Sequence, residues 1–106
     1  MEVITLDQWH EQIKADANAI IIDVRKEDEV EDGYIKNAIN IDVENPPKFM
    51  EEAQKLDPNN AYYVYCRTGQ RSMQACLVLE SLGFSKVYKL DVGFEGWVEN
   101  GNEVEK

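Results

Sequence analysis

The sequence predicts an α/β fold, in which a central parallel sheet of four or five strands carries helices on both of its faces. Short apolar runs alternate with segments that repeat apolar residues at helical spacing along the 106 residues of the chain. Two of these runs end on an aspartate or a cysteine, and the working site of an open parallel sheet lies at such strand ends. No linker or repeat divides the chain, so we expect residues 1–106 to form a single domain.

The first half of the chain predicts two helices and two strands. A capping box at residues 5–8 begins the first helix. The apolar stripe of this helix comprises Leu6, Trp9, Ile13 and Ala17. The apolar run at 19–24 predicts a buried strand whose carboxyl end carries Asp23, and a second, shorter strand is expected at 39–41. The acidic segment 26–32 predicts a short helix with a solvated surface, because it lacks the ligand spacing of a calcium loop.

The second half of the chain predicts two more strands and three helices. The prolines at 46 and 47 suit the first turn of a helix. The apolar stripe of that helix comprises Phe49, Met50, Ala53 and Leu56. The run 61–65 predicts the central strand, and 86–90 predicts a further one. Helices are expected at 72–82, where a glycine ends the helix, and at 93–98.

The charge balance limits the partners of this chain. It has 21 acidic and 11 basic residues, which give a net charge of −10. We therefore expect no nucleic acid and no membrane surface as a partner, and any small anion must rely on local arginines. No apolar run reaches the ~20 residues of a membrane span, and the N-terminus lacks the segments of a signal peptide. The expected compartment is a reducing cytoplasm.

The two cysteines differ in their surroundings. Cys76 lies beside the apolar stripe of the helix at 72–82, so we expect it to fill the core. Cys66 ends the central strand and precedes a turn and a helix. That order places its thiol among backbone N–H groups at the positive end of a helix dipole, where the thiolate is favoured. We predict that Cys66 is a nucleophile, and we expect neither a metal nor an organic cofactor.

Three segments of the chain, taken in order, resemble the single-domain rhodanese, or thiosulfate sulfurtransferase, family. They are 22–25 (Ile-Asp-Val-Arg), the loop 66–71 (Cys-Arg-Thr-Gly-Gln-Arg) and the glycine- and tryptophan-containing segment 90–97. The resemblance implies a rhodanese-like three-layer fold over nearly the whole chain. Residues 33–38 (Gly-Tyr-Ile-Lys-Asn-Ala) depart from the family's usual Gly-His-Ile-Pro-Gly-Ala. We expect this change to affect local packing and partner choice rather than the chemistry.

The resemblance implies sulfur transfer in two steps, with a small anionic sulfur donor. The Cys66 thiolate takes the outer sulfur of a donor such as thiosulfate, and cyanide or a thiol then removes it from the Cys66 persulfide. The groups expected to bind the donor and the persulfide are those of Arg67, Thr68, Gly69, Gln70, Arg71 and Arg25. Gly69 permits a positive φ and a close approach of the backbone to sulfur. Asp23 is the expected partner of a loop arginine, and Arg25 is expected beside the entrance.

Two other functions remain open at the level of the sequence. One is a sulfur-carrier or protein-binding module that keeps the fold and hands sulfur to a protein acceptor. The other is a cysteine-dependent phosphatase or arsenate reductase, whose related loops place five residues between cysteine and arginine. Four residues lie between Cys66 and Arg71, and the smaller ring suits a sulfur atom better than a phosphoryl group.

Overall fold

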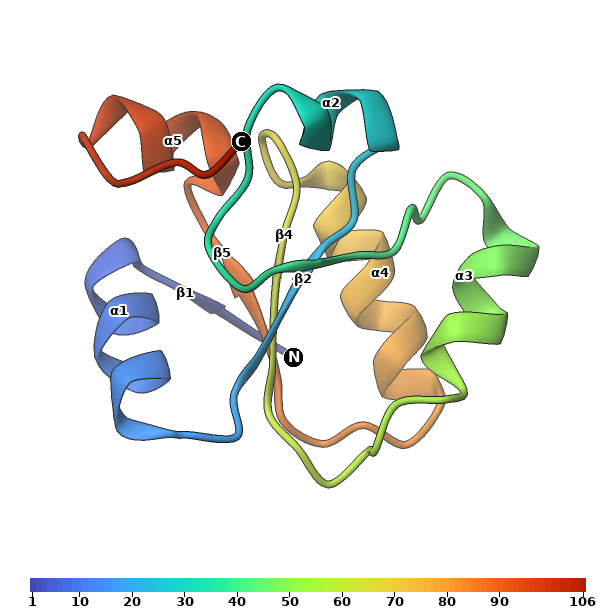
Figure 1. Cartoon of the computed structure of the whole chain (residues 1–106). Coiled ribbons are helices and arrows are strands. Elements are labelled where there is room, and N and C mark those ends of the chain that lie inside the picture. Colours follow the sequence, from blue (N-terminus) through green and yellow to red (C-terminus); the bar gives the residue numbers. More distant parts are fainter.

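Five parallel strands form the central sheet of the computed structural model, which describes residues 1–106 (Figure 1). The strands are β1 (Glu2–Ile4), β2 (Ile20–Asp23), β3 (Ile39–Asn40), β4 (Tyr62–Tyr65) and β5 (Val87–Leu90). They lie in the order β1-β5-β4-β2-β3, and every pairing is parallel. The predicted α/β fold with a parallel sheet is therefore confirmed.

The edge strand β1 was absent from the four strands that the sequence pattern assigns. It is three residues long, and only Ile4 among them is buried. A run this short shows neither an apolar block nor an alternation that can be told from a coil. Its place in the sheet comes from pairing with β5, where Ile4 lies opposite Leu90.

Five helices connect and cover the strands. They are α1 (Leu6–Ala15), α2 (Glu27–Glu31), α3 (Pro46–Ala53), α4 (Gln70–Ser81) and α5 (Gly93–Glu99). Two expectations of the sequence pattern are corrected. Ala17 lies beyond the end of α1 and is exposed, because the chain turns extended at Asp16. Helix α4 begins at Gln70 rather than residue 72, because Gly69 at its N-cap takes a φ of 134°.

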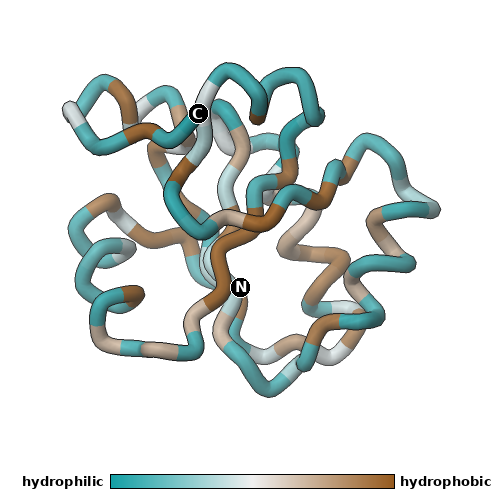
Figure 2. Tube along the Cα trace, in the orientation of Figure 1, coloured by the Kyte–Doolittle hydropathy of each residue, from teal (hydrophilic) through white to brown (hydrophobic).

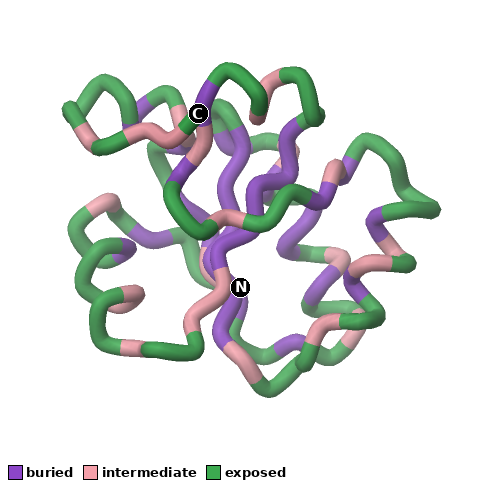
Figure 3. The backbone as a smooth tube through the Cα atoms, in the orientation of Figure 1, coloured by how far each residue is buried: buried purple, intermediate pink, exposed green.

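The two faces of the sheet carry separate apolar clusters. Helices α3 and α4 cover one face, where Phe49, Ala75 and Leu79 pack on the inner strands. Helices α1 and α5 cover the other face, where Trp9 and Trp97 pack on Tyr63 and Tyr65. Figure 2 and Figure 3 show hydrophobic and buried residues following the central strands between these layers. Helices on both faces were expected, and the structure confirms them.

The inner strands bring their carboxyl ends to one edge of the sheet. Asp23 at the end of β2 lies opposite Tyr65 at the end of β4 in the parallel register. Cys66 follows Tyr65 directly, so the predicted nucleophile and Asp23 belong to the same edge. No helix of the structure has the length and apolar character needed to cross a bilayer.

Candidate active site

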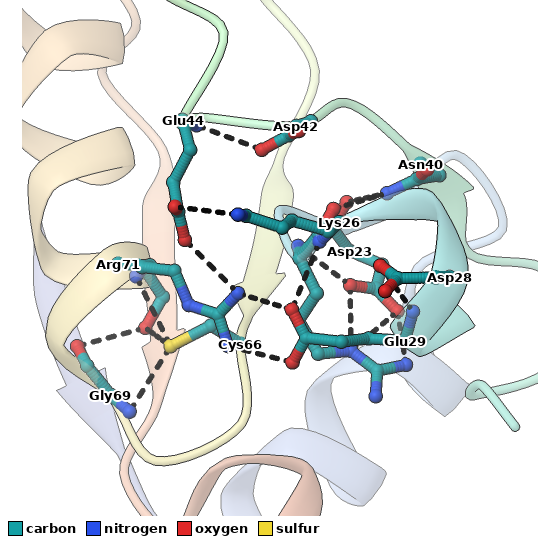
Figure 4. Close-up of polar contacts among 12 residues, drawn as sticks. Asp23, Lys26, Asp28, Glu29, Asn40, Asp42, Glu44, Cys66, Gly69 and Arg71 are labelled. Carbon is teal, nitrogen blue, oxygen red and sulfur yellow. Dashed lines mark hydrogen bonds and ion pairs between the residues drawn. The ribbon is translucent and has the colours of Figure 1, made fainter. Parts of the chain in front are cut away.

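The sulfur of Cys66 lies inside a turn that its own loop forms between β4 and α4. The backbone N–H groups of Gly69 and Ser72 donate to Sγ over 3.1 and 3.3 Å (Figure 4). The thiol donates to the Ser72 hydroxyl oxygen at 3.3 Å, and that hydroxyl donates to the carbonyl of Gly69 at 3.0 Å. Two N–H dipoles that point at one sulfur favour negative charge on it. Of the amides expected to face the sulfur, those of Gly69 and Ser72 are hydrogen-bonded to it.

Both cysteines are buried, but the groups around them differ. Cys66 is only 1% exposed, so a donor reaches its sulfur only when neighbouring side chains move. Cys76 is also buried, but it packs among apolar side chains inside α4, and burial raises the pKa of its thiol to about 12. The expectation that Cys76 fills the core is confirmed, and its thiol stays protonated at neutral pH.

The expected positive φ at Gly69 is confirmed. Gly69 also lies next to Lys89, a residue that was not expected near the loop. A Cβ on Gly69 would lie 2.8 Å from the ammonium nitrogen of Lys89. Lys89 belongs to β5 and is buried among the residues that face α4. Sequence reasoning did not name Lys89, because a lysine inside a strand carries no local sign of what it approaches.

The predicted contact between Asp23 and a loop arginine is wrong. The Asp23 carboxylate instead accepts hydrogen bonds from the Arg25 guanidinium, with 2.7 Å between Nη2 and Oδ2, and from the hydroxyl of Tyr65 at 2.6 Å. All three side chains are buried. Arg25 also donates to the carbonyl of Gly33 at 2.7 Å and lies 4.3 Å above the ring of Phe94.

This buried network changes the roles expected for its members. Arg25 was expected beside the entrance, and it does line a surface cleft next to the loop. Its charge, however, is compensated by Asp23, and it connects β2 to the segment that begins at Gly33. The hydroxyl of Tyr65 accepts the backbone N–H of Ile35 at 3.0 Å, and burial raises the pKa of Tyr65 above its usual range. Asp23 therefore supports the site by holding Arg25 and Tyr65, and not by binding the loop.

Arg71 reaches across from α4 and pairs with two glutamates. Its Nη2 donates to Glu29 Oε2 at 2.9 Å, and its Nη1 lies 3.3 Å from Glu44 Oε1. Glu44 is also 3.5 Å from the ammonium of Lys26. The cause is the early start of α4, which places Arg71 in the first helical turn, facing α2. Glu29 is thus partly buried in an ion pair, and the expected fully solvated surface of α2 needs this correction.

The remaining loop side chains face solvent. Arg67 is 67% exposed, and its Nε lies 3.5 Å from a carboxylate oxygen of Glu95, which is also exposed. Thr68 and Gln70 are exposed, and neither side chain makes a hydrogen bond in the structure. Substrate contacts by these three residues stay predictions.

Helix α5 holds the loop by its backbone, a role that sequence reasoning missed. The N–H of Phe94 donates to the carbonyl of Cys66 at 2.8 Å, and the N–H of Glu95 donates to that of Arg67 at 3.0 Å. Gly93 has a φ of 64°, and a Cβ there would lie 2.4 Å from the carbonyl oxygen of Arg67. In the sequence, this contact could have been inferred only from the glycine at 93, because a close backbone approach requires a residue without a side chain.

Replacing Gly93 by alanine is expected to displace the loop. The added methyl group would collide with backbone and also force alanine into the left-handed region, so stability should fall by at least about 2 kcal/mol. Sulfur transfer should fall with it, by about tenfold or more, because loop displacement moves the amides away from sulfur. Denaturant unfolding and initial rates measure the two effects.

Gly101→Ala is the matched control for that change. Gly101 also has a positive φ, of 76°, but a Cβ there would meet nothing within 4 Å. The Gly101→Ala variant should lose only about 1 kcal/mol of stability, from backbone strain, and its rate of sulfur transfer should be unchanged. Equal losses of activity in both variants would show that contact with the loop is unimportant.

One surface cleft is lined by a residue of the Cys66 loop. Its volume is about 370 Å³, and its lining includes Arg67 together with side chains of α2 and α5. A second cleft of about 430 Å³ lies beside α1 and α5, with Trp9, His10 and Trp97 in its wall, and contains no loop residue. Of these two clefts, only the first borders the Cys66 loop, through Arg67.

The Glu29–Arg71 pair gives stability a defined pH dependence. The Arg71 guanidinium lowers the pKa of Glu29 from 4.5 to about 2. Because the pKa is lower in the folded state, the pair stabilises the fold above about pH 4.5 and loses this contribution as the pH falls toward 2. Glu29→Gln should be less stable than the wild type by about 1 kcal/mol near neutral pH, since water screens the partly exposed pair. Urea unfolding at several pH values should show this difference vanishing near pH 2, and a constant difference would contradict it.

Comparison with known proteins gives a consistent result. The sequence model of the rhodanese-like domain family matches residues 6–100. The Bacillus subtilis (strain 168) protein named "Putative sulfurtransferase YtwF" is 38% identical over 87 residues, which cover 82% of this chain and 81% of that protein. The thiosulfate sulfurtransferase GlpE of Coxiella burnetii (strain RSA 331 / Henzerling II) is 33% identical, with coverage of 91% and 85%.

Solved structures agree with the sequence matches. The crystal structure of a rhodanese-related protein from Thermoplasma volcanium has a TM-score of 0.85 and 30% identity, and the match covers 99% of this chain and 98% of the other. Some relatives are much longer. The chain spans only 40% of the tRNA uridine(34) hydroxylase of Legionella pneumophila (strain Corby), to which it is 34% identical.

Proposed function

Because this chain belongs to the rhodanese family, we propose that it is a sulfurtransferase that carries sulfane sulfur on Cys66. The single observation on which the proposal depends is the convergence of the Gly69 and Ser72 N–H groups on the Cys66 sulfur. These groups are fixed by the loop and by α4, so they need no reorganisation when negative charge develops at the sulfur. Prearranged N–H donors of this kind stabilise the anion before and after sulfur uptake.

In the first step, the Cys66 thiolate attacks the outer sulfur of a sulfane donor. A bond forms between Sγ and that sulfur, and the bond that joined it to the donor breaks. The bonding electrons leave with the rest of the donor, as sulfite from thiosulfate or as a thiolate from an organic persulfide. The Cys66 persulfide that results keeps one negative charge when it is ionised, and the two amides remain its nearest donors.

In the second step, a thiophilic acceptor removes the outer sulfur. Cyanide or a thiolate forms a bond to it, the sulfur–sulfur bond breaks, and its electrons restore the Cys66 thiolate. The Ser72 hydroxyl, 3.3 Å from Sγ, accepts a hydrogen bond from the resting thiol. The thiol proton leaves to solvent before the attack, and the Gly69 and Ser72 amides then face the thiolate.

Intact-mass spectrometry tests the proposal most directly. After incubation with a sulfane donor the protein should gain one sulfur, and cyanide should remove it while forming thiocyanate. Cys76→Ser should behave like the wild type, since Cys76 lies in the core. A protein that never gains sulfur, or one that still gains it in Cys66→Ser, would refute the assignment.

The same protein sample also distinguishes an enzyme that turns over from a sulfur carrier. An enzyme regenerates its thiol many times with cyanide or a small thiol, whereas a carrier module gives one transfer and then waits for a protein acceptor. Hydrolysis of an aryl phosphate without persulfide formation would instead favour the phosphatase alternative.

A further inference from the structure

The arginines around the Cys66 loop are paired with carboxylates. Arg71 lies between Glu29 and Glu44, and Figure 4 shows its side chain passing the Cys66 sulfur on its way to them. Lys26 is also paired with Glu44. The sequence pattern predicts that Arg71 binds a dianionic donor. The two glutamates neutralise the positive charge that this binding would use.

The cleft beside the loop has the wrong charge for a dianion. Four carboxylates and two guanidinium groups line it. The carboxylates are those of Glu29, Asp32, Glu95 and Glu99. Of the guanidinium groups, that of Arg25 is neutralised by buried Asp23, and that of Arg67 lies 3.5 Å from Glu95. A dianion in this cleft therefore meets an excess of negative charge at short range.

The cleft also offers apolar surface. Phe94 and Val98 of α5 form part of its wall, and Val98 is 48% exposed. The Phe94 ring stacks on Tyr65, with 6.0 Å between centroids, and lies 4.3 Å from the Arg25 guanidinium, so it is held in place. An organic group of modest size would bury part of this surface, whereas a sulfonate group would gain nothing from it.

We propose that the sulfur donor of Cys66 is an organic persulfide whose organic part is uncharged or cationic, and that Glu29 and Glu44 select against thiosulfate by neutralising Arg71. This inference depends on the proposed function. The Cys66 thiolate bonds to the outer sulfur of R–S–SH, the bond between the two sulfurs of the donor breaks, and R–S⁻ leaves with the electron pair. The outer sulfur keeps its proton, and the products are the Cys66 persulfide and a thiolate.

Lys89 does not change this balance. Its ammonium lies next to Gly69, on the face of the sheet that α4 covers, and Lys89 is not among the side chains that line the cleft. It can act on the bound sulfur across the loop, but it does not meet the donor where the carboxylates do.

Two probe donors and three variants test the selection. The donors are thiosulfate and 2-hydroxyethyl persulfide, and the measured quantity is kcat/KM for sulfur uptake by Cys66. The test variants are Glu44→Gln and the double variant Glu29→Gln/Glu44→Gln. Glu51→Gln is the control, because it removes the same charge from an exposed ion pair with Lys55, on α3, outside the cleft.

The double variant should raise kcat/KM for thiosulfate by about threefold to tenfold, which is the range of one partly screened charge interaction. The value for 2-hydroxyethyl persulfide should change by less than about twofold, because that donor brings no dianionic group near Arg71. Glu44→Gln alone should give a smaller rise for thiosulfate, and it provides the test if the double variant fails to fold. Glu51→Gln should leave both values unchanged.

Different results would refute the donor selection and the proposed function. Sulfur uptake from both donors with no effect of the glutamate variants, or with equal effects on both donors, would overturn the selection and leave the proposed function standing. A Cys66 that takes sulfur from neither donor would overturn both.

Discussion

Cys66→Ser is expected to lower sulfur transfer by about 1,000-fold or more. A serine hydroxyl at neutral pH is a far weaker nucleophile than a thiolate, and it forms no persulfide. The loop would survive the change, because the Gly69 and Ser72 amides can donate to an oxygen as they do to sulfur. The variant therefore isolates the chemistry of one atom.

Cys76→Ser is the matched control, measured by steady-state thiocyanate formation. Its thiol is buried in the core, so any loss should follow from stability and not from the chemical step. A buried hydroxyl costs about 1–3 kcal/mol, and the assay should therefore be run where the variant is fully folded. Comparable activity of Cys66→Ser and Cys76→Ser would contradict the proposed nucleophile.

The parts of the site that could be predicted are those that one short segment determines. The order of strand, cysteine, turn and helix lies within residues 62–72, and the amides that face the sulfur come from the same segment. The positive φ of Gly69 and the core position of Cys76 follow equally from local pattern. The strands were predictable for the same reason, except for β1, whose three residues depend on pairing with β5.

The ion pairs were not predictable in this way, because their partners are distant in sequence. Arg71 pairs with Glu29, 42 positions earlier, and the chain offers 21 acidic residues as candidates. The Asp23–Arg25 pair did have a local signal. Side chains two positions apart after a strand point to the same side, so the aspartate at the strand end has its nearest arginine on its own segment. The start of α4 at Gln70 mattered as well, because it turns Arg71 toward α2.

Asp23→Asn is expected to lower the free energy of unfolding by about 3–5 kcal/mol, a large part of the stability of a small domain. The side chain keeps its shape but loses its charge, which leaves the buried Arg25 guanidinium without a counter-ion. It also replaces one acceptor of the Arg25 and Tyr65 hydrogen bonds by an amide donor. Urea unfolding with a common m-value measures the loss.

Two further variants separate the charge from the hydrogen bonds. Tyr65→Phe removes one hydroxyl that bonds to Asp23 and Ile35, and it should cost only about 1–3 kcal/mol. Asp23→Leu/Arg25→Met removes both charges, and it should be more stable than Asp23→Asn, because an apolar pair leaves no charge uncompensated. If the double variant is instead the least stable of the three, the pair contributes a net attraction beyond its cost of burial. The Asp23–Arg25 ion pair would then stabilise the fold, in addition to positioning the carboxyl ends of β2 and β4.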